Sequence, residues 1–316
     1  MPKIDFHDAE AGVHSIFQFG LAEPDLDEAQ RFLAAFGVEP TRAGDRIEIR
    51  AGGGDHVWAT ILKSETARKK LQYLSLGCYE QDYGRIRDQV EAAGGVFSNG
   101  HPAGPTGGFW FRDPFGLLVQ VLVAAKTMPD AKARMDDLNV GANVRGAPAR
   151  SAARKVGATR LSHVALFTPD LDRALAFYTQ ALGLRLADRS GDIIAFTYGR
   201  HGSDHHMLAF AAGPAPGLHH TSWDMPSVEC LGLANTQLRA AGYAIHWGPG
   251  RHVLGSNYFN YTADTWGQLW ENSCHIDYIE KDAPWEVANF ADEDAFYLWG
   301  PDAPAEMMQF TEETAA

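Results

Sequence analysis

The feature that most restricts how this chain can fold is an internal repeat. The stretch "FGLAEPDLDEAQRFLAAFGV" near the start matches "VALFTPDLDRALAFYTQALGL" in the second half. Both predict an apolar strand, then a helix that begins at a Pro-Asp-Leu-Asp turn with Asp as its N-cap. Each half also holds a second copy, starting near Leu71 and near Leu218, whose helix ends at Ala-Ala-Gly. We therefore expect four copies of one supersecondary unit.

Alternating apolar segments complete the repeating unit. The segments "GGFWFRDPFGLLVQVLV" and "NYFNYTADTWGQLWENS" alternate apolar and polar residues, and Gly116 and Gly267 lie at their turns. Each unit is therefore predicted to be a strand, a helix and three strands. We predict an α+β fold in which four βαβββ units form two domains, each a partly open barrel.

A change of composition separates the two predicted domains. Residues 126–159 are rich in Ala, Gly and Arg and lack the apolar periodicity that precedes and follows them. We predict an N-terminal domain of two units at residues 1–125, a linker at 126–159 and a C-terminal domain of two units at 160–316. A chain of 316 residues is long enough for two such domains.

Charge and cysteine content favour a small-molecule partner in a reducing compartment. A net charge of -13 argues against nucleic acid or an anionic membrane, because phosphate-rich surfaces select clusters of Lys and Arg. Three cysteines cannot form a complete set of disulfides, and none are spaced as C-x-x-C. The sequence has no apolar run long enough to cross a bilayer and no basic-then-apolar leader. We expect a cytoplasmic protein that does not associate with membranes.

Alignment of the two halves identifies side chains that could bind a metal. Three metal-binding residue types of the second half each align with a glutamine of the first: His163 with Gln18, His220 with Gln72, and Glu271 with Gln120. Two imidazoles and one carboxylate form the facial triad that binds non-haem Fe(II) with open positions, whereas three amides make a poor site. We therefore predict one metal ion in the second half and none in the first.

Each of these residues has a simpler interpretation when it is taken alone. A histidine among apolar residues, such as His163, is usually a hydrogen-bonded core residue, and Glu271 would usually be a surface carboxylate at a strand end. His219 and His220 point to opposite faces of a strand, so at most one of them faces a cavity. The metal site is favoured because the three ligand types fall on three different strands of one repeat plan.

Four segments together resemble the type I extradiol (meta-cleaving) catechol dioxygenases of the vicinal oxygen chelate superfamily. They are "LSHVALFTPDLDRALAFY", "HHMLAFAAG", "GLHHTSW" and "GPGRHVLGSNYFNYTADTWGQLWE". The resemblance covers nearly the whole chain as four units of two glyoxalase-like domains, and it is strongest between Leu161 and Glu271. It implies that Fe(II), or alternatively Mn(II), is bound by His163, His220 and Glu271. Members of this family are commonly homo-oligomers, which we also expect here.

The resemblance implies roles for three further residues. His206 corresponds to the acid-base histidine of the family, and we prefer it to His205 because it directly precedes the apolar run "MLAF". His252 and Tyr261 correspond to a pair of side chains on the opposite side of the substrate. Their spacing from each other and from Glu271 is that of the family motif.

Departures from the family pattern bear on the substrate. Asp264 is followed by Thr265 where the family has proline, so we expect an altered turn or pocket lining there. Some relatives that cleave carboxylated catechols carry an arginine five residues before the equivalent of His252, where this chain has Trp247. The C-terminal segment resembles an active-site lid but offers Phe296 and no arginine. A substrate carboxylate would be poorly paired.

The expected activity is extradiol cleavage of a catechol by O2 in aromatic degradation. The substrate is expected to carry an apolar or small ring substituent instead of a carboxylate, and the product is of the 2-hydroxymuconic-semialdehyde type. The residues expected to contact the substrate are Trp247, Tyr198 and Phe296. Alternatives are a dioxygenase that cleaves hydroquinone rings, a metal-dependent isomerase or epimerase on the same scaffold, and a metal-free binding protein.

Overall fold

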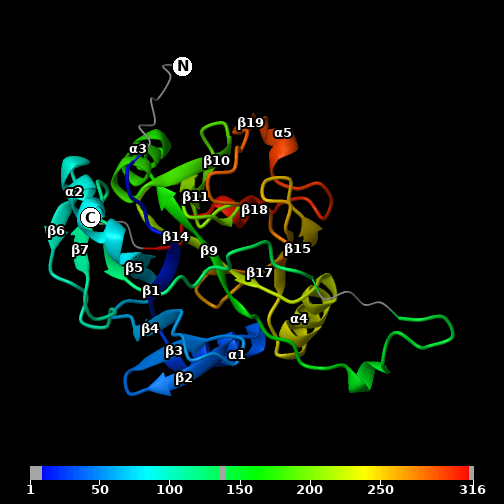
Figure 1. Ribbon diagram of the computed structural model, residues 1–316. Coiled ribbons are helices and arrows are strands. Elements are labelled where there is room, and N and C mark those ends of the chain that lie inside the picture. The colour runs from blue at the N-terminus through cyan, green and yellow to red at the C-terminus, as the bar shows by residue number, and fades with distance from the viewer. Residues whose placement is uncertain (1–8, 136–139, 313–316) are drawn as a thin grey trace.

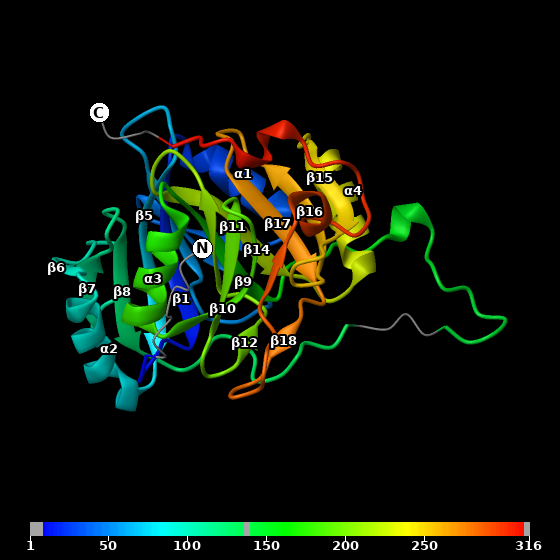
Figure 2. The same cartoon turned by 90° about the horizontal axis from the view of Figure 1, so that it is seen from above.

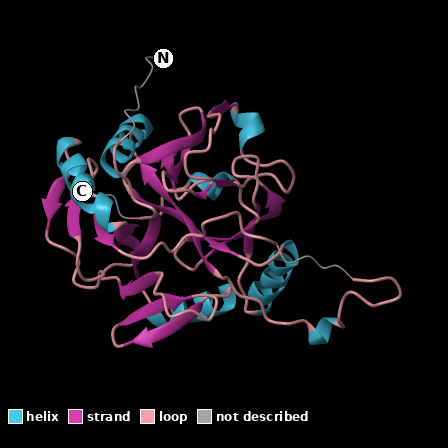
Figure 3. Cartoon of the chain, in the orientation of Figure 1, coloured by secondary structure: helices cyan, strands magenta, loops and turns pink. Residues whose placement is uncertain are grey.

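Two large sheets dominate the architecture (Figures 1 and 3). A computed structural model of the chain describes residues 9–135 and 140–312. Helices are few, and the element order repeats strand, helix and three strands four times, with one short extra strand in the third copy. The predicted α+β class and the four βαβββ units are confirmed. Both large sheets are open sheets with edge strands, not closed barrels.

The first sheet contains two units joined through β1 and β5. Its strand order is β2-β3-β4-β1-β5-β8-β7-β6, and β1 and β5 run antiparallel. Its strands are β1 (Ser15–Glu23), β2 (Glu39–Ala43), β3 (Arg46–Arg50), β4 (Ala59–Lys63), β5 (Lys70–Cys78), β6 (Val96–Ser98), β7 (Phe109–Arg112) and β8 (Leu118–Val123).

The second sheet repeats this plan and gains one strand from the C-terminal segment. Its order is β15-β16-β17-β14-β9-β13-β11-β10-β19, with β9 and β14 antiparallel, and β12 and β18 form a separate pair. The strands are β9 (Arg160–Thr168), β10 (Leu184–Ser190), β11 (Ile194–Gly199), β12 (Ser203–Asp204), β13 (Leu208–Ala212), β14 (Gly217–Asp224), β15 (Ile245–Arg251), β16 (Tyr258–Ala263), β17 (Leu269–Cys274), β18 (Tyr278–Ile279) and β19 (Ala288–Phe290).

One helix follows the first strand of each unit. They are α1 (Leu26–Phe36), α2 (Glu80–Ala92), α3 (Leu171–Leu182) and α4 (Val228–Ala240), and the short elements are α5 (Asp292–Ala295), η1 (Arg150–Ala152) and η2 (Ala305–Met308). The predicted N-caps are confirmed, because Asp25 accepts from two backbone N–H groups of α1 and Asp170 from one of α3. Gly37 and Gly183 end these helices in the left-handed conformation, where glycine carries no steric penalty.

The two halves pack helix against helix. α1 lies against α4 and α2 against α3, so each helix of one half covers a helix of the other. One apolar core runs through both halves. Both views show residues near η1 projecting away from the sheets (Figures 1 and 2). The domain boundaries stay a prediction, and residues 1–8, 136–139 and 313–316 of the predicted segments lie outside the described residues.

Membrane-spanning helices and paired cysteines are both missing from the described parts of the chain. None of the helices there has the length and apolar character needed to cross a membrane. Cys78, Cys230 and Cys274 are buried and free, as expected for a chain without a disulfide framework.

Candidate metal centre and substrate cavity

The register of the second sheet aligns the predicted site residues in one row. From β9 through β14, β17 and β16 to β15, the aligned residues are His163, Ser222, Glu271, Tyr261 and Trp247. Residues aligned across a sheet share a face. Ser222 is small and leaves room between its neighbours, and His220, two residues earlier on β14, shares the same face.

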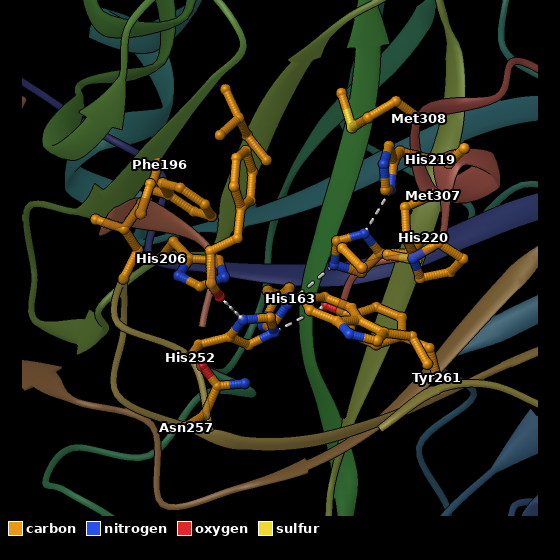
Figure 4. A pocket seen from close by; sticks show the side chains of 18 residues that line it. His163, Phe196, His206, His219, His220, His252, Asn257, Tyr261, Met307 and Met308 are labelled. Atoms are coloured by element: carbon orange, nitrogen blue, oxygen red, sulfur yellow. Dashed lines mark hydrogen bonds between the residues drawn. The ribbon is translucent and has the colours of Figure 1, made fainter. Parts of the chain in front are cut away.

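The three predicted metal ligands form one cluster. The nitrogen and oxygen atoms of His163, His220 and Glu271 that could bind an ion lie within 4.8 Å of one another. His163 Nε2 is 3.1 Å from Glu271 Oε2 and 3.3 Å from His220 Nε2. The side chains are 2%, 5% and 0% exposed. Figure 4 shows the rings of His163 and His220 turned toward each other from neighbouring strands. This is the only such cluster among the described residues.

The charges and unused atoms of this cluster suit a divalent cation. Burial opposes ionisation of Glu271, but hydrogen bonds and the charges of the neighbouring histidines lower the pKa of its carboxyl below the usual value. Burial, and then the neighbouring His219, lowers the pKa of His220 well below its usual value. Glu271 Oε2 is buried without a hydrogen bond. An ionised carboxylate beside a neutral imidazole is the protonation state that metal binding requires.

His252 and Tyr261 lie on one side of the cluster. His252 Nδ1 is 2.6 Å from the backbone carbonyl of Phe296, which can only accept, so Nδ1 carries the hydrogen. His252 Nε2 lies 3.2 Å from the hydroxyl oxygen of Tyr261, within hydrogen-bonding distance. Burial, and then the Glu271 carboxylate, raises the pKa of Tyr261 well above its usual value. Tyr261 therefore keeps its proton and stays a donor.

His206 packs against His163. The two ring centroids are 4.0 Å apart, and Figure 4 shows His206 close to His163. Burial is the main cause that lowers the pKa of His206 well below its usual value, followed by the charge of His163. A neutral imidazole at this position can accept a proton.

A mostly apolar cavity of about 250 Å³ opens over these side chains (Figure 4). Besides the histidines, its lining contains Ile194, Phe196, Trp247, Leu254, Asn257, Tyr261, Phe296, Met307 and Met308. Of the predicted substrate contacts, Trp247 and Phe296 border the cavity. The described lining residues include neither arginine nor lysine.

Tyr198 does not border the cavity, although we predicted that it contacts the substrate. Ile194 and Phe196 face the cavity from β11. Tyr198 lies two residues beyond Phe196 on the same strand, where it is buried in an apolar cluster. The face of the strand was suitable, but the cavity ends before this residue is reached.

The C-terminal segment forms one wall of the cavity. The residues of this segment that line the cavity are Ala295, Phe296, Ala303, Pro304, Ala305, Met307 and Met308. Glu312 ties this segment to the body, because its Oε1 accepts from the backbone N–H of Leu218 at 2.9 Å and lies 3.7 Å from the buried ammonium of Lys69. The segment is therefore held against one side of the cavity, and its role as a lid stays a prediction.

The strand register corrects one of the three matches between the halves. Ser75 on β5 pairs with Gln18, and Ser222 on β14 pairs with His163. Because Gln18 and His163 correspond to each other in the two halves, Ser75 and Ser222 are equivalent positions. Two residues before them come Tyr73 and His220, so the predicted match of His220 with Gln72 is wrong. The alignment was displaced because α2 begins five residues after Ser75, whereas α4 begins six residues after Ser222.

The turn after β16 keeps its shape, contrary to our expectation. In the turns at Asp113 and Asp264, the carboxylate Oδ1 accepts from the backbone N–H groups two and four residues later, at 2.8 or 2.9 Å. The first turn contains Pro114 and the second Thr265 at the same place. None of these turn residues borders the cavity. The aspartate therefore fixes the turn with or without proline.

Some residues that hold the site in place were not predicted. Asn257 Nδ2 donates to Glu271 Oε1 at 3.1 Å. His205, the rejected member of its doublet, bonds to His206, and Asp188 bonds to His205. Asn257 and His205 lie in segments without regular periodicity, and Asp188 reads as an ordinary strand carboxylate, so no sequence pattern marks them. The doublet itself was the one available signal.

Both sequence and fold are similar to those of known proteins. Residues 160–272 match the Glyoxalase/Bleomycin resistance protein/Dioxygenase superfamily. Metapyrocatechase 2 from Cupriavidus necator is 47% identical over 302 residues, which cover 95% of this chain and 93% of that protein. The Mn(II)-bound glyoxalase from Novosphingobium aromaticivorans superimposes with a TM-score of 0.76 at 25% identity over 95% of each chain. A halotolerant catechol dioxygenase gives a TM-score of 0.73 at 21% identity over 94% of this chain and 97% of its own.

Proposed function

The chain belongs to the extradiol catechol dioxygenases of the vicinal oxygen chelate superfamily, and we propose that it uses Fe(II) to cleave a catechol with a neutral ring substituent. The ring opens at a bond next to, not between, the two hydroxyls. The product is of the 2-hydroxymuconic-semialdehyde type and carries both atoms of O2. The observation that carries this proposal is the buried cluster of two imidazoles and an unneutralised carboxylate at the floor of an apolar cavity.

The proposed metal ligands are His163, His220 and Glu271. Two imidazoles and one carboxylate would hold Fe(II) or Mn(II) and would leave coordination positions free for other ligands. When bound, the ion brings catechol and O2 together and relays electrons between them. Asn257 orients Glu271 through the hydrogen bond to Oε1, which leaves Oε2 directed at the two histidines.

The proposed catalytic side chains are His206, His252 and Tyr261. His206 is neutral and accepts the proton that a catechol hydroxyl loses on binding, which is general base catalysis. His252 is held by the Phe296 carbonyl, and Tyr261, which remains protonated, lies beside it. Their facing groups, His252 Nε2 and the Tyr261 hydroxyl, hydrogen-bond the oxygens of the substrate, and the hydroxyl hydrogen of Tyr261 stabilises the negative charge that develops there.

The cavity wall determines the class of ring substituent. Trp247, Phe296, Met307 and Phe196 present apolar surface, and the described lining residues carry no guanidinium or ammonium group. A carboxylate buried here would lack a cation and would pay the full cost of desolvation. A methyl, alkyl, halogen or small aromatic substituent would instead gain free energy from burial.

An aerobic assay with anaerobically loaded protein tests this proposal. The protein is purified without oxygen, loaded with Fe(II), and mixed in air with catechol, 3-methylcatechol and a carboxylated catechol. We expect O2 uptake and a yellow ring-fission product with the first two, and much slower turnover with the third. Hydroquinone in the same assay tests the alternative dioxygenase reaction. The proposal is wrong if protein holding one iron per chain takes up no O2 with any catechol.

The identity of the metal ion is tested separately. Reconstitution with Mn(II) in place of Fe(II) under the same conditions compares the two ions, and we expect higher turnover with Fe(II). We also propose a homo-oligomer, which a mass measurement in solution tests directly.

A further inference from the structure

We propose that Asp188 and His205 form a buried hydrogen-bonded relay behind His206 that fixes which ring nitrogen of His206 carries a hydrogen. In this arrangement the nitrogen of His206 that faces the cavity is bare and can accept a proton. This inference rests on the proposed function of the site, because it explains how His206 is prepared for its role there. It makes Asp188 and His205 positioning residues.

The three side chains lie in line and are almost fully enclosed. His205 Nε2 is 2.8 Å from Asp188 Oδ2, and His205 Nδ1 is 3.0 Å from His206 Nδ1. The exposed fractions of Asp188, His205 and His206 are 6%, 1% and 3%. The only member of the line that borders the cavity is His206. The cluster therefore connects the cavity to a buried carboxylate.

The direction of each hydrogen bond follows from the carboxylate. Asp188 accepts, so His205 Nε2 carries a hydrogen. With one hydrogen on the His205 ring, its Nδ1 is bare and accepts from His206 Nδ1–H, 3.0 Å away. In neutral His206, Nε2 is consequently bare. A single acceptor at one end thus determines the tautomer of two rings.

Neighbouring groups hold this line in place. The backbone N–H of Ala288 on β19 donates to Asp188 Oδ1 at 2.7 Å, which leaves Oδ2 for His205. A Cβ atom at Gly255 would lie 3.3 Å from His206 Cε1 and 3.4 Å from His205 Nδ1, so that backbone packs closely on both rings. Phe196 packs on His206 with ring centroids 4.8 Å apart. Rotation of either ring is therefore restricted.

The relay also receives the charge formed in the proton transfer. The O–H bond of the substrate breaks, an N–H bond forms at His206 Nε2, and the bonding pair of the O–H bond stays on oxygen. The imidazolium formed keeps its Nδ1–H on His205, whose own N–H points at the Asp188 carboxylate. The Asp188 carboxylate, two hydrogen bonds away from His206, stabilises the positive charge on the His206 ring, as in other carboxylate-histidine pairs.

Asp188→Asn is the informative variant because it reverses the donor and acceptor roles along the hydrogen-bonded series while the side chain keeps nearly the same size and shape. Ala288 N–H must still be accepted, so the amide oxygen takes that place and the amide NH2 faces His205 Nε2. His205 then carries its hydrogen on Nδ1 and donates to His206 Nδ1, which leaves a hydrogen on His206 Nε2. We expect kcat to fall about 100-fold or more, the usual contribution of a general base, with KM nearly unchanged.

Nitrogen NMR reads the tautomers without any turnover. In 15N-histidine protein loaded with diamagnetic Zn(II), we expect a protonated Nδ1 and a bare Nε2 for His206, assigned by loss of its signals in His206→Asn. Asp188→Asn should exchange the two signals, and Asp192→Asn, a change at an exposed carboxylate on the next turn, should leave them alone. If wild-type His206 carries its hydrogen on Nε2, the relay is overturned even if the enzyme is active. If no catechol is cleaved, the proposed function fails, while the spectrum still decides the relay.

A double-mutant cycle separates positioning from a structural role. If Asp188 acts through His206, Asp188→Asn adds no further loss of kcat in a His206→Asn background. If the two substitutions lower kcat by independent factors that multiply in the double variant, Asp188 has a structural role and the proposal is overturned. A loss of metal content in Asp188→Asn would lead to the same conclusion. Should Asp188→Asn fail to fold, His205→Phe serves instead. It removes the acceptor of His206 Nδ1–H, so kcat should fall in wild-type background and remain unchanged in His206→Asn.

Discussion

The same row of positions crosses both large sheets, but the two rows carry different side chains. In the second half the row contains two of the three proposed ligands, His163 and Glu271, and the proposed catalytic residue Tyr261. In the first half the aligned residues, from β1 through β5, β8 and β7 to β6, are Gln18, Ser75, Gln120, Trp110 and Ser98. The backbone register is the same, so the fold permits a metal site in either half and the side chains determine which half has one.

The first half uses its row to close a hydrogen-bond network. The hydroxyl of Tyr73 donates to Gln18 Oε1, and that of Ser75 donates to Gln120 Oε1, each at 2.7 Å. Gln120 Nε2 donates to two backbone carbonyls at 2.9 and 2.8 Å. In the second half, by contrast, Glu271 Oε2 has no hydrogen-bond partner. Satisfied amides stabilise a core, whereas an unsatisfied carboxylate needs a cation.

Steric filling distinguishes the halves as well. A Cβ at Gly20 would lie 2.2 Å from the Tyr73 ring, so only glycine lets this ring lie over β1. Trp110 packs edge-on against Tyr73, as Tyr261 packs against His220. In the first half these rings occupy the space that would otherwise be a cavity.

The largest expected effect comes from replacing a carboxylate of the second half by the amide that occupies the equivalent position, Gln120, in the first half. Glu271→Gln removes the charge that would hold the ion, and metal affinity should fall by more than about 100-fold, beyond the 10–100-fold loss typical of groups that only support ligands. Iron content after dialysis and kcat measure this, and the metal-free protein should remain folded. Full iron occupancy in Glu271→Gln would contradict the ligand assignment.

The reverse exchange should damage the first half without creating a site. Gln120→Glu places a carboxylate against the two carbonyl oxygens that now accept from the amide. We expect the free energy of unfolding to fall by about 3–5 kcal/mol, the usual penalty for an uncompensated buried charge. Chemical denaturation at pH 7 measures the loss. A second bound metal per chain would show that one carboxylate suffices and would refute the comparison.

Removal of one hydroxyl should have opposite consequences in the two halves. Tyr73→Phe leaves Gln18 without its donor and should cost about 1 kcal/mol of stability with normal turnover. Tyr261→Phe should leave the free energy of unfolding nearly unchanged and lower kcat about 10- to 100-fold, since an electrostatic donor to the substrate is lost. Paired melting curves and kinetics distinguish these results, and equal losses of kcat in both variants would contradict them.

The smallest expected effect concerns a carboxyl pair where the halves meet. Burial, and then Asp264, raises the pKa of Glu23 well above its usual value. Between the ordinary pKa of a glutamate and the raised pKa of Glu23, the folded state binds more protons than the unfolded state. The free energy of unfolding therefore falls as pH rises through this range. Glu23→Gln should raise the unfolding midpoint at pH 8 more than at pH 5. An equal change at both pH values would show that Glu23 does not titrate there.

Features that depend on periodicity, such as the four repeated units, could be predicted from the sequence. Residue-by-residue matches between the halves could not, because a single inserted residue shifts them. The repeat correctly indicated four units, and the ligand types of His163, His220 and Glu271 were matched to strands that the fold does bring together. The match of His220 with Gln72 failed because one extra residue before α4 shifts the alignment without changing the pattern. Only the ladder of hydrogen-bonded strands reveals such an offset.

Other misses arose because a cavity is a three-dimensional property. Tyr198 has a suitable residue type and strand face, yet the cavity ends at Phe196. The altered sequence at Thr265 suggested an altered turn, but the carboxylate of Asp264 fixes that turn by itself. Asp188 lies on β10, and no spacing rule links it to His206. Local sequence carries none of this information.

The contact between Lys69 and Glu312 connects the first half directly to the segment that borders the cavity of the second half. Lys69 belongs to the first half, and its buried ammonium group lies beside the carboxylate that anchors that segment. It also donates to Gln268 Oε1 at 2.7 Å and to the Leu218 carbonyl at 3.2 Å. A substitution at Lys69 would therefore be expected to alter the cavity of the second half, although the residue lies in the first.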